Sequence, residues 1–579
     1  MSNFMHNSLT NPFKFYILIF KERGFDYMPT KNYSISLLVY MYISLPFFIF
    51  ASGFMKGVFS VIATLVIGSS IFLAAKASNG LYAFPFEKKS CLKLLLGLLI
   101  ITAIVLLSGI GNIMWQNNDH ATRNTIFEIL AEYSWPPKYS DEGPGLIYYI
   151  GFWLPSALVA KLTSLSFGYI FQVIWAVIGI FILWYLICLV HKKIVLYPLI
   201  IFMFFSGLDI VGRTIVFNTV DKLNALQIGT WAFSKGSELT SHIEWWPSWF
   251  QYSSHITQLF WVFNQSIPVW IATLLVLVER TNKNLVFIMG VTLLSSTLPF
   301  IGLIPIFAWC VLTNHDGDML SRPFTDDFKK SFLSLFTFQN VFGGGVSGIM
   351  SFLYLRGNTA SQITSAQTAE TAKTATSNPS FSLPVFLLII AIWIIAFVLL
   401  SDSLQWKKVY VFYLLPALPV AFMTARLPNF KLAYYFYFII LEVLVYFLLT
   451  LSVYKSSSLY FIVLCSMLLV PFFTVGKSID FCMRASIPLI VLLCLFVTTS
   501  LASYIKNQKK VLAMLLCLVL LIGAVTPFME IMRTIEATEY NLEKYGAVWN
   551  DIKTERQVFG GKNFSGKIEG NIFFEVFAN

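Results

Sequence analysis

The stretch Pro384–Leu400, PVFLLIIAIWIIAFVLL, contains no charged residue. It approaches the roughly 20 residues that an α-helix needs to cross a lipid bilayer. Helices suit hydrocarbon because they satisfy their own backbone hydrogen bonds, and the chain lacks the roughly 10-residue alternating strands of a membrane β-barrel. Similar apolar runs occur at Leu94–Ile110, Tyr434–Leu451, Leu459–Phe473 and Val511–Ile522. These runs predict membrane-spanning helices.

The composition of the whole chain agrees with this prediction. Of its 579 residues, 57% are hydrophobic and only 12% are charged, and the mean hydropathy is +0.73. A soluble domain has about 25% charged residues and could not bury so much apolar surface. We therefore expect an all-α polytopic membrane protein with roughly 12–16 transmembrane helices, whose extracytoplasmic loops carry short interfacial helices.

Cysteine spacing and charge distribution exclude other classes. The seven cysteines lie mostly in apolar segments, without a CxxC pair or metal-ligand spacing, so they are interpreted as small core hydrophobes. The net charge of +11 comes from short clusters of Lys and Arg beside hydrophobic segments. Such clusters set membrane topology, so we expect a lipid bilayer as partner and no nucleic acid.

The basic clusters also predict an orientation. Residues 1–34 are basic and are expected in the cytoplasm, and spans at about 35–54 and 57–75 return the chain to a second basic loop. The third span, about 93–111, then places the polar loop 112–145 on the extracytoplasmic side. The expected location is the bacterial cytoplasmic membrane. The second basic loop contains Lys76, Lys88, Lys89 and Lys93.

Residues 146–190 leave two topologies open. If 146–164 and 166–190 both cross the membrane, the basic triplet His191–Lys193 lies outside, against the positive-inside rule. If they make one net crossing, the triplet is cytoplasmic and the polar region 212–250 emerges on the same face as the first loop. We favour the second topology.

Other apolar segments extend the transmembrane domain over residues 35–528. They are expected at about 194–211, 262–279, 284–313, 332–355, 382–401, 408–425, 431–452, 457–475, 485–504 and 510–528. Residues 356–380 are rich in Thr, Ser and Ala and predict a flexible loop. Residues 529–579 are polar and predict an extramembrane tail.

The first polar loop holds one group of candidate site residues. Asp119 and Arg123 are four residues apart, so they share one face of a short helix on the membrane surface. A carboxylate can accept a proton from an attacking hydroxyl, while His or Arg can stabilise a phosphate leaving group. An exposed helix with a capping Asp would show the same pattern. The further candidates here are His120, Asn124 and Glu128.

The second polar region combines aromatic and polar residues. Aromatic faces pack against sugar rings, whereas Asn, Gln, His and Glu bind hydroxyl groups. The alternative is the belt of Trp and Tyr found at any membrane surface. The candidate substrate-binding residues are His242, Glu244, Trp246, Tyr252 and Gln265.

Two ion pairs are expected beside hydrophobic segments, Asp209 with Arg213 and Asp480 with Arg484. Ionisable residues are costly there and are functional candidates, although each pair could serve only as an internal or end-of-helix pair. An arginine at a helix mouth suits a lipid-linked phosphate. The run Gly343–Gly345 lacks the following Lys-Ser or Lys-Thr of a nucleotide-binding loop, which is therefore rejected.

Four motifs together resemble the GT-C class of membrane glycosyltransferases, which use polyprenyl-phosphate-linked sugars on the extracytoplasmic side. They are QNNDHATRN after Trp115, WPP with YYIGFWLP (Trp135–Pro137, Tyr148–Pro155), YSSHITQLFWVFNQSIPVW (Tyr252–Trp270) and DFCMRASIP (Asp480–Pro488). The resemblance implies a polyprenyl-phosphate sugar donor and a glycan or glycolipid acceptor of the cell envelope.

The resemblance also implies roles for individual residues. Asp119, with His120 beside it, would be catalytic, as base or metal-associated carboxylate, and Arg484 or Arg213 would bind the donor phosphate. Many members carry an Asp-x-Asp or Glu-Asp pair, whereas here Asn118 precedes the single acid. The use of a divalent cation, Mg²⁺ or Mn²⁺, is therefore left open.

Two other functions remain alternatives. A transporter or flippase of lipid-linked glycans would have a similar number of helices, but it would typically show internal repeats and ionisable residues near the bilayer midplane. An O-antigen-type polymerase or ligase uses a related donor but usually places its large loop late in the chain. Here the richest loop follows the third span, which favours the glycosyltransferase.

Overall fold

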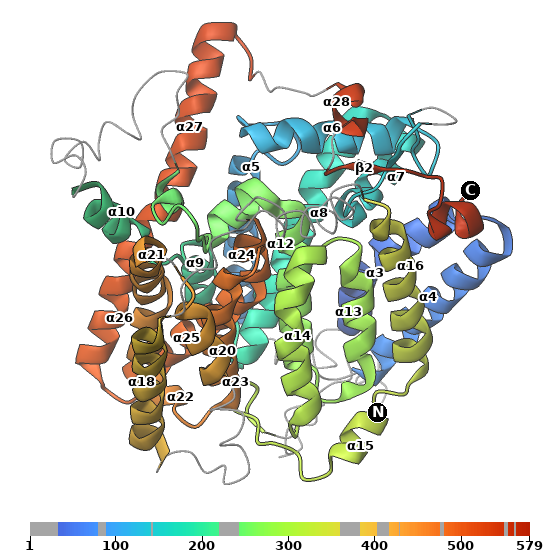
Figure 1. Ribbon diagram of the computed structural model, residues 1–579. Coiled ribbons are helices and arrows are strands. Elements are labelled where there is room, and N and C mark those ends of the chain that lie inside the picture. Colours follow the sequence, from blue (N-terminus) through green and yellow to red (C-terminus); the bar gives the residue numbers. More distant parts are fainter. Residues whose placement is uncertain are drawn as a thin grey trace, which may run out of the picture.

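The chain folds as an almost entirely helical bundle in the computed structural model (Figure 1). The structure describes residues 33–78, 88–139, 143–218, 242–315, 317–358, 382–401, 416–427, 429–474, 480–548, 554–560 and 563–579. Its two short strands, β1 (Gly145–Leu146) and β2 (Ser565–Gly566), pair antiparallel. The predicted all-α class is confirmed.

Within the described residues, eight helical stretches are long and apolar enough to cross a membrane. They contain α3 (Tyr33–Phe54), α4 (Gly57–Ala77), α5 (Lys88–Leu107), α8 (Leu165–Val190), α12 (His255–Val278), α21 with η5 and α22 (Asn429–Ile439, Ile440–Leu444, Val445–Tyr454), α25 (Ile487–Lys506), and α26 with α27 (Lys510–Gly523, Val525–Tyr545). A multi-pass membrane protein is the architecture that these stretches indicate.

Shorter helices fill the bundle and cap its ends. Four shorter apolar ones involve η1 with α7 (Gly151–Trp153, Leu154–Leu162), α14 (Thr297–Leu312), α18 (Leu383–Ser401) and α23 with η6 (Ser458–Leu469, Val470–Phe472). The others are α6 (Asn118–Glu132), α9 (Tyr197–Met203), α10 (Asp209–Asn218), η2 (Ile243–Trp245), η3 (Asn282–Asn284), α13 (Leu285–Leu293), α15 (Phe328–Leu333), η4 (Gln339–Gly344), α16 (Gly345–Arg356), α20 (Ala417–Thr424), α24 (Asp480–Ala485), α28 (Glu555–Phe559) and η7 (Phe573–Phe577).

One predicted span is two helices. The apolar segment 284–313 forms α13 and α14, which lie side by side (Figure 1). The chain turns at Leu294–Ser296, and Pro299 stands in the first turn of α14, where a proline does not interrupt helical hydrogen bonding. Uninterrupted hydropathy hid this turn. Most of the predicted loop 356–380 and part of the span 408–425 lie outside the described residues.

The helix α8 fixes how the chain passes between the two ends of the bundle. Near its start, Tyr169 donates a hydrogen bond to Glu128 of α6 at 2.9 Å. Just beyond its end, Lys93 of α5 donates to the backbone oxygen of Ile194 at 3.3 Å. The basic triplet therefore lies near the start of α5, and α8 connects that end of the bundle to α6. The topology of residues 146–190 stays a prediction.

The helix α6 lies across the opposite end of the bundle, at the top of Figure 1, which we refer to as the α6 end. The last residues of the chain also reach this end, because Asn579 N donates to Phe54 O at 3.1 Å and β2 pairs with β1. The predicted tail boundary at 529 falls inside α27, which rises beyond the neighbouring helices in Figure 1.

The helix α12 is buried almost throughout and packs against α8, α14 and α25. Its backbone leaves the helical conformation at Val262, where φ is −138° and ψ is 33°. Close to this break, the carbonyl oxygen of Phe260 accepts hydrogen bonds from Asn117 Nδ2 at 2.8 Å and from His120 Nε2 at 2.7 Å. The break in α12 is thus the point to which the start of α6 is bound.

Candidate functional site

The first group of polar residues at the α6 end begins with α6 itself. Asn117 caps the helix, and its side chain accepts from the backbone nitrogen of Asp119 at 3.1 Å. One turn later Arg123 forms an ion pair with Asp119, with 3.1 Å between Nη2 and Oδ2. The arginine side chain is 5% exposed and the carboxylate 48% exposed. The pair therefore presents a buried cation and an accessible base, as the spacing predicted.

A second pair with the same spacing comes from α24. Arg484 Nη2 lies 3.7 Å from Asp480 Oδ2, and the exposures repeat the first pair, at 10% for the arginine side chain and 46% for the carboxylate. Arg484 Nη1 also donates to the hydroxyl of Tyr149. The predicted pair is confirmed, and Tyr149 is a partner that the sequence had not indicated.

Ring contacts connect the two pairs. The ring of Tyr148 lies 3.6 Å from that of Tyr149 and 6.4 Å from that of Trp153, which lies 6.0 Å from the Phe263 ring beside Arg123. Burial raises the pKa of this phenol well above its usual value, while Arg484 and Arg123 both lower it, so both cations act on the same side chain. Burial alone would lower the pKa of Arg484, but Tyr149, Asp480 and, more weakly, Asp119 raise it on balance. We refer to these six residues as the arginine site: Asp119, Arg123, Tyr148, Tyr149, Asp480 and Arg484.

Both arginines have N–H groups without a hydrogen-bond partner. In Arg123 these are Nε and Nη1, and in Arg484 it is Nε. The guanidinium of Arg123 lies over the ring of Phe263 at 5.8 Å, and that of Arg484 over Tyr149 at 5.9 Å. The N–H groups that lack a partner remain able to donate, which suits the oxygens of a phosphate or carboxylate.

The neighbours of Asp119 and Arg123 along α6 have other contacts. His120 is 1% exposed and bonds to Phe260 O, and burial, with the charge of Arg123, lowers its pKa to about 3. Asn124 Nδ2 donates to Gln116 Oε1 at 2.7 Å. Glu128 accepts from Tyr169, away from the arginine site, and burial raises its pKa. These residues hold α6 in place, and His120 is a neutral donor to backbone.

A second group of polar residues lies around α10 and η2. At its centre is the carboxylate cluster, which consists of Asp209, Glu244 and Glu442. Each is at most 3% exposed. Asp209 accepts from Ser206 at 2.9 Å and from Trp246 and Thr526 at 3.2 Å each. Three buried acids in one region require shared protons or many donors, because burial disfavours their charged forms.

The proton balance of the cluster follows from its packing. Burial and the charge of Glu244 raise the pKa of Asp209, hydrogen bonds that include one with Glu442 lower it, and the pKa is about 6 on balance. Glu244 itself accepts from Gln251 Nε2 at 3.0 Å and from Ser254 N at 2.9 Å. Asp209 and Glu442 therefore form a buried carboxyl pair in which the pKa of Asp209 is raised.

No family model, no curated protein and no solved structure matches this chain. The site must therefore be interpreted from its own chemistry.

Within the ranges that the structure describes, no group of three or more His, Cys, Asp or Glu side chains is arranged to hold a metal ion. The positive charge at the arginine site is that of Arg123 and Arg484.

A buried ion pair connects η2 to α27. His242 Nε2 lies 3.0 Å from Glu530 Oε2, which also pairs with Arg533 at 3.0 Å. The other oxygen of this carboxylate accepts from Trp261 Nε1 at 2.6 Å. Burial lowers the pKa of His242, but Glu530 and Glu244 more than compensate and raise it on balance.

The remaining predicted residues occupy separate positions. Trp246 belongs to the carboxylate cluster, and Arg213 Nη1 donates to the backbone oxygen of His242 at 3.5 Å. Tyr252 donates to the backbone oxygen of Met467, and Gln265 lies in the interior of α12. The structure thus unites Asp119, Arg123 and Arg484, and places His242, Glu244, Trp246 and Arg213 in the second group. Asn124, Glu128, Tyr252 and Gln265 join neither group.

Several residues of both groups were missed. Glu442 is the sole acid in the apolar run Tyr434–Leu451, so its intramembrane charge was a usable signal. It lies in the π-helical turn η5, a feature that is frequent at functional sites. Glu530 lies in the segment predicted as a tail, and no sequence pattern links it to His242.

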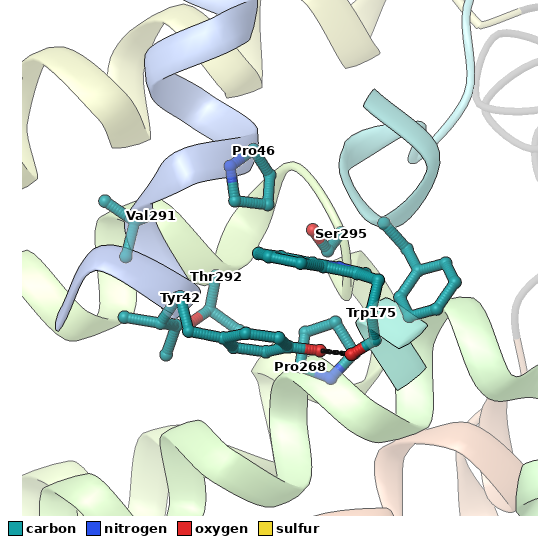
Figure 2. A pocket seen from close by; sticks show the side chains of 9 residues that line it. Tyr42, Pro46, Trp175, Pro268, Val291, Thr292 and Ser295 are labelled. Carbon is teal, nitrogen blue, oxygen red and sulfur yellow. Dashed lines mark hydrogen bonds between the residues drawn. The ribbon is translucent and has the colours of Figure 1, made fainter. Parts of the chain in front are cut away.

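One cavity lies deeper in the bundle (Figure 2). The ring of Tyr42 stacks on Trp175 at 4.0 Å and its hydroxyl donates to the backbone oxygen of Trp175 at 3.0 Å. The volume of about 10 Å³ is about the space that one water molecule needs, so it cannot hold a sugar. Its lining residues are Tyr42, Ile43, Pro46, Phe152, Trp175, Pro268, Val291, Thr292 and Ser295.

Proposed function

We propose that the protein is a membrane glycosyltransferase that moves a sugar from a polyprenyl-phosphate donor to a glycan or glycolipid of the cell envelope. The reaction would take place at the α6 end, on the extracytoplasmic side of the bacterial cytoplasmic membrane. One observation carries the proposal: two buried arginines with unpaired N–H groups each pair with an accessible carboxylate. The phosphate of a lipid-linked donor needs the cationic groups, and the hydroxyl of the sugar acceptor needs the carboxylate.

The arginine site supplies both roles in the reaction. Arg123 and Arg484 would donate hydrogen bonds to the oxygens of the donor phosphate, which carries negative charge before and after transfer. Asp119 would accept the proton of the acceptor hydroxyl as its oxygen forms a bond to the anomeric carbon. The bond between that carbon and the phosphate oxygen breaks, and polyprenyl phosphate leaves with the bonding electron pair.

The apolar surface of the bundle suits a bilayer in which the polyprenyl chain of the donor would lie. The helix α5 exposes a row of large apolar side chains, which a bilayer would cover. A polyprenyl chain would stay in that bilayer while its phosphate reaches the α6 end. The exposed residues of α5 include Leu92, Leu95, Leu96, Leu98 and Leu99.

The test compares wild type with Asp119→Asn, both purified in detergent. Release of polyprenyl phosphate is measured from a panel of polyprenyl-phosphate-linked sugars with cell-envelope acceptors. We expect turnover by the wild type and its loss in the variant, with donor binding retained. A wild type that turns over no donor in the panel would contradict the proposal.

The carboxylate cluster favours a second candidate, a proton-coupled transporter of lipid-linked glycans. Buried acids in membrane proteins are typical of proton relays, and Glu442 lies inside a candidate span. The test is movement of a lipid-linked glycan across proteoliposome bilayers under a pH gradient, in wild type and Glu442→Gln. Movement that depends on Glu442, without sugar transfer, would replace the glycosyltransferase with the transporter.

A further inference from the structure

Two consecutive amides lie just past the break in α12. Asn264 and Gln265 are both fully buried, at 0% exposure. In each, both side-chain polar atoms are without a hydrogen-bond partner: Oδ1 and Nδ2 of Asn264, and Oε1 and Nε2 of Gln265. A buried amide without partners is unfavourable, and native proteins contain few of them. Two in succession point to a ligand that supplies the missing partners.

The other polar side chains of the same helix show what a structural role looks like. Gln258 is also at 0% exposure, yet its Nε2 donates to Ser253 O at 2.7 Å and its Oε1 accepts from Trp270 Nε1 at 2.9 Å. Ser266 donates to the carbonyls of Gln258 and Val262 across the break, at 3.1 Å each. Gln258 and Ser266 thus find partners for their polar atoms within the protein, and His255 of the same helix bonds through Nδ1 and leaves only Nε2 without a partner. In Asn264 and Gln265, by contrast, every side-chain polar atom lacks a partner.

The position of these amides relates them to the arginine site. Phe263, the residue before Asn264, carries the guanidinium of Arg123 over its ring and lies 6.0 Å from the ring of Trp153. The indole Nε1 of Trp153, also fully buried, is a further donor without a partner. Phe263 thus lies near both Arg123 and Trp153, and the two unpartnered amides follow it directly along α12.

The chemistry of the unpartnered atoms defines the ligand class. Each amide offers one acceptor oxygen and an NH₂ group with two donors, and the indole offers one donor. A phosphate has acceptors only and would leave the amide oxygens unmatched. A hydroxyl group both donates and accepts, so it can match all of these atoms.

We propose that Asn264 and Gln265, with Trp153, form a binding site for neutral hydroxyl groups beneath the arginine site. Two sources have this chemistry: the sugar ring of the donor, and ordered water. The sugar source rests on the proposed function, because it requires a donor phosphate on Arg123 and Arg484. The water source does not, and the experiment separates the two.

The variants Asn264→Leu and Gln265→Met remove the polar atoms and keep the side-chain shapes, and Gln258→Met is the matched control. Binding to purified protein in detergent is measured for polyprenyl phosphate with and without one attached glucose, mannose, galactose or arabinose. Radiolytic hydroxyl labelling of Phe263 and Trp153 reports bound water beside them. Melting temperatures are recorded for all proteins.

If the sugar is the ligand, the wild type prefers one sugar-bearing lipid, and each variant loses about tenfold of that preference while binding the bare lipid unchanged. If water is the ligand, no preference exists, and labelling of Phe263 and Trp153 in the wild type falls in the variants. Gln258→Met should lower the melting temperature because its amide is bonded within the protein.

The inference is overturned if Asn264→Leu and Gln265→Met change neither the lipid preference nor the labelling. The melting temperatures of these two variants would then equal or exceed that of the wild type, because replacing a buried amide that binds nothing removes an unfavourable group. Failure of the proposed function has a different signature, since the wild type would bind neither lipid. In that case the labelling result alone decides between a water site and none.

Discussion

Asp119→Asn is expected to abolish sugar transfer and leave the fold almost as stable as the wild type. The two oxygens of Asp119 are half exposed, and the ion pair with Arg123 is therefore screened by solvent. Such a pair contributes less than about 1 kcal/mol to stability. Asparagine also keeps an oxygen that accepts from Arg123, so the melting temperature should change little.

The effect on catalysis should be much larger. A general base contributes about 100- to 10,000-fold to a rate, which corresponds to roughly 3–5 kcal/mol of activation free energy. Asp480→Asn is a matched control, because Asp480 is 46% exposed against 48% for Asp119 and pairs with its own arginine four residues on. Arg484 is also held by Tyr149, so this variant should lose less than about tenfold.

The assay records kcat for release of polyprenyl phosphate, donor affinity and melting temperature for the wild type and both variants. Loss of kcat in Asp119→Asn with the other two quantities unchanged supports the base. If Asp480→Asn loses turnover and Asp119→Asn keeps it, the base has been assigned to the wrong carboxylate. A large fall in the melting temperature of Asp119→Asn would make the residue structural and refute the reasoning.

Three further outcomes are expected. Arg123→Met should weaken binding of polyprenyl phosphate about 30-fold or more, since a buried contact to a charged group is worth about 2–5 kcal/mol. The measurement is a binding titration with polyprenyl phosphate, and Arg426→Met, at an exposed arginine, is the control. Glu530→Gln should destabilise the fold by about 2–4 kcal/mol, because His242 and Arg533 lose their carboxylate partner. Denaturation of the exposed Glu539→Gln should match the wild type. The pKa of Asp209, raised by burial to about 6, makes its folded form bind the proton more tightly, so its contribution to stability is lost as pH rises through about 6. Asp209→Asn should therefore reduce the fall in melting temperature between about pH 5 and about pH 8, and an unchanged difference would contradict the buried carboxyl pair.

The sequence predicted the features that depend on hydropathy and on local spacing. Uninterrupted apolar runs predicted helices such as α5, α8 and α25, because a continuous helix is the structure that lipid favours for them. Spacing of four residues predicted the ion pairs of Asp119 and of Asp480. Both kinds of pattern are contained in one segment of chain.

Features that depend on contacts between distant segments could not be predicted in this way. Tyr149 meets Arg484 across more than three hundred residues, and His242 meets Glu530 across almost as many. Hydropathy also hid two interruptions inside apolar runs. The turn between α13 and α14 contains only Ser295 and Ser296 as polar residues within a long apolar segment, and the break at Val262 lies among apolar residues. The site depends on such interruptions, since they free polar backbone groups in the interior.

The break in α12 links the arginine site to the ion pair of His242 and Glu530. Phe260 O receives the hydrogen bonds of Asn117 and His120, and so sets where α6, with Asp119 and Arg123, lies. The next residue, Trp261, donates to Glu530, and Phe263 carries the guanidinium of Arg123. A continuous helix would use the Phe260 carbonyl for its own hydrogen bonding, and α6 would lose its anchor. Substituting His120 should therefore act through the position of Asp119, because His120 itself is buried and neutral and already donates to backbone.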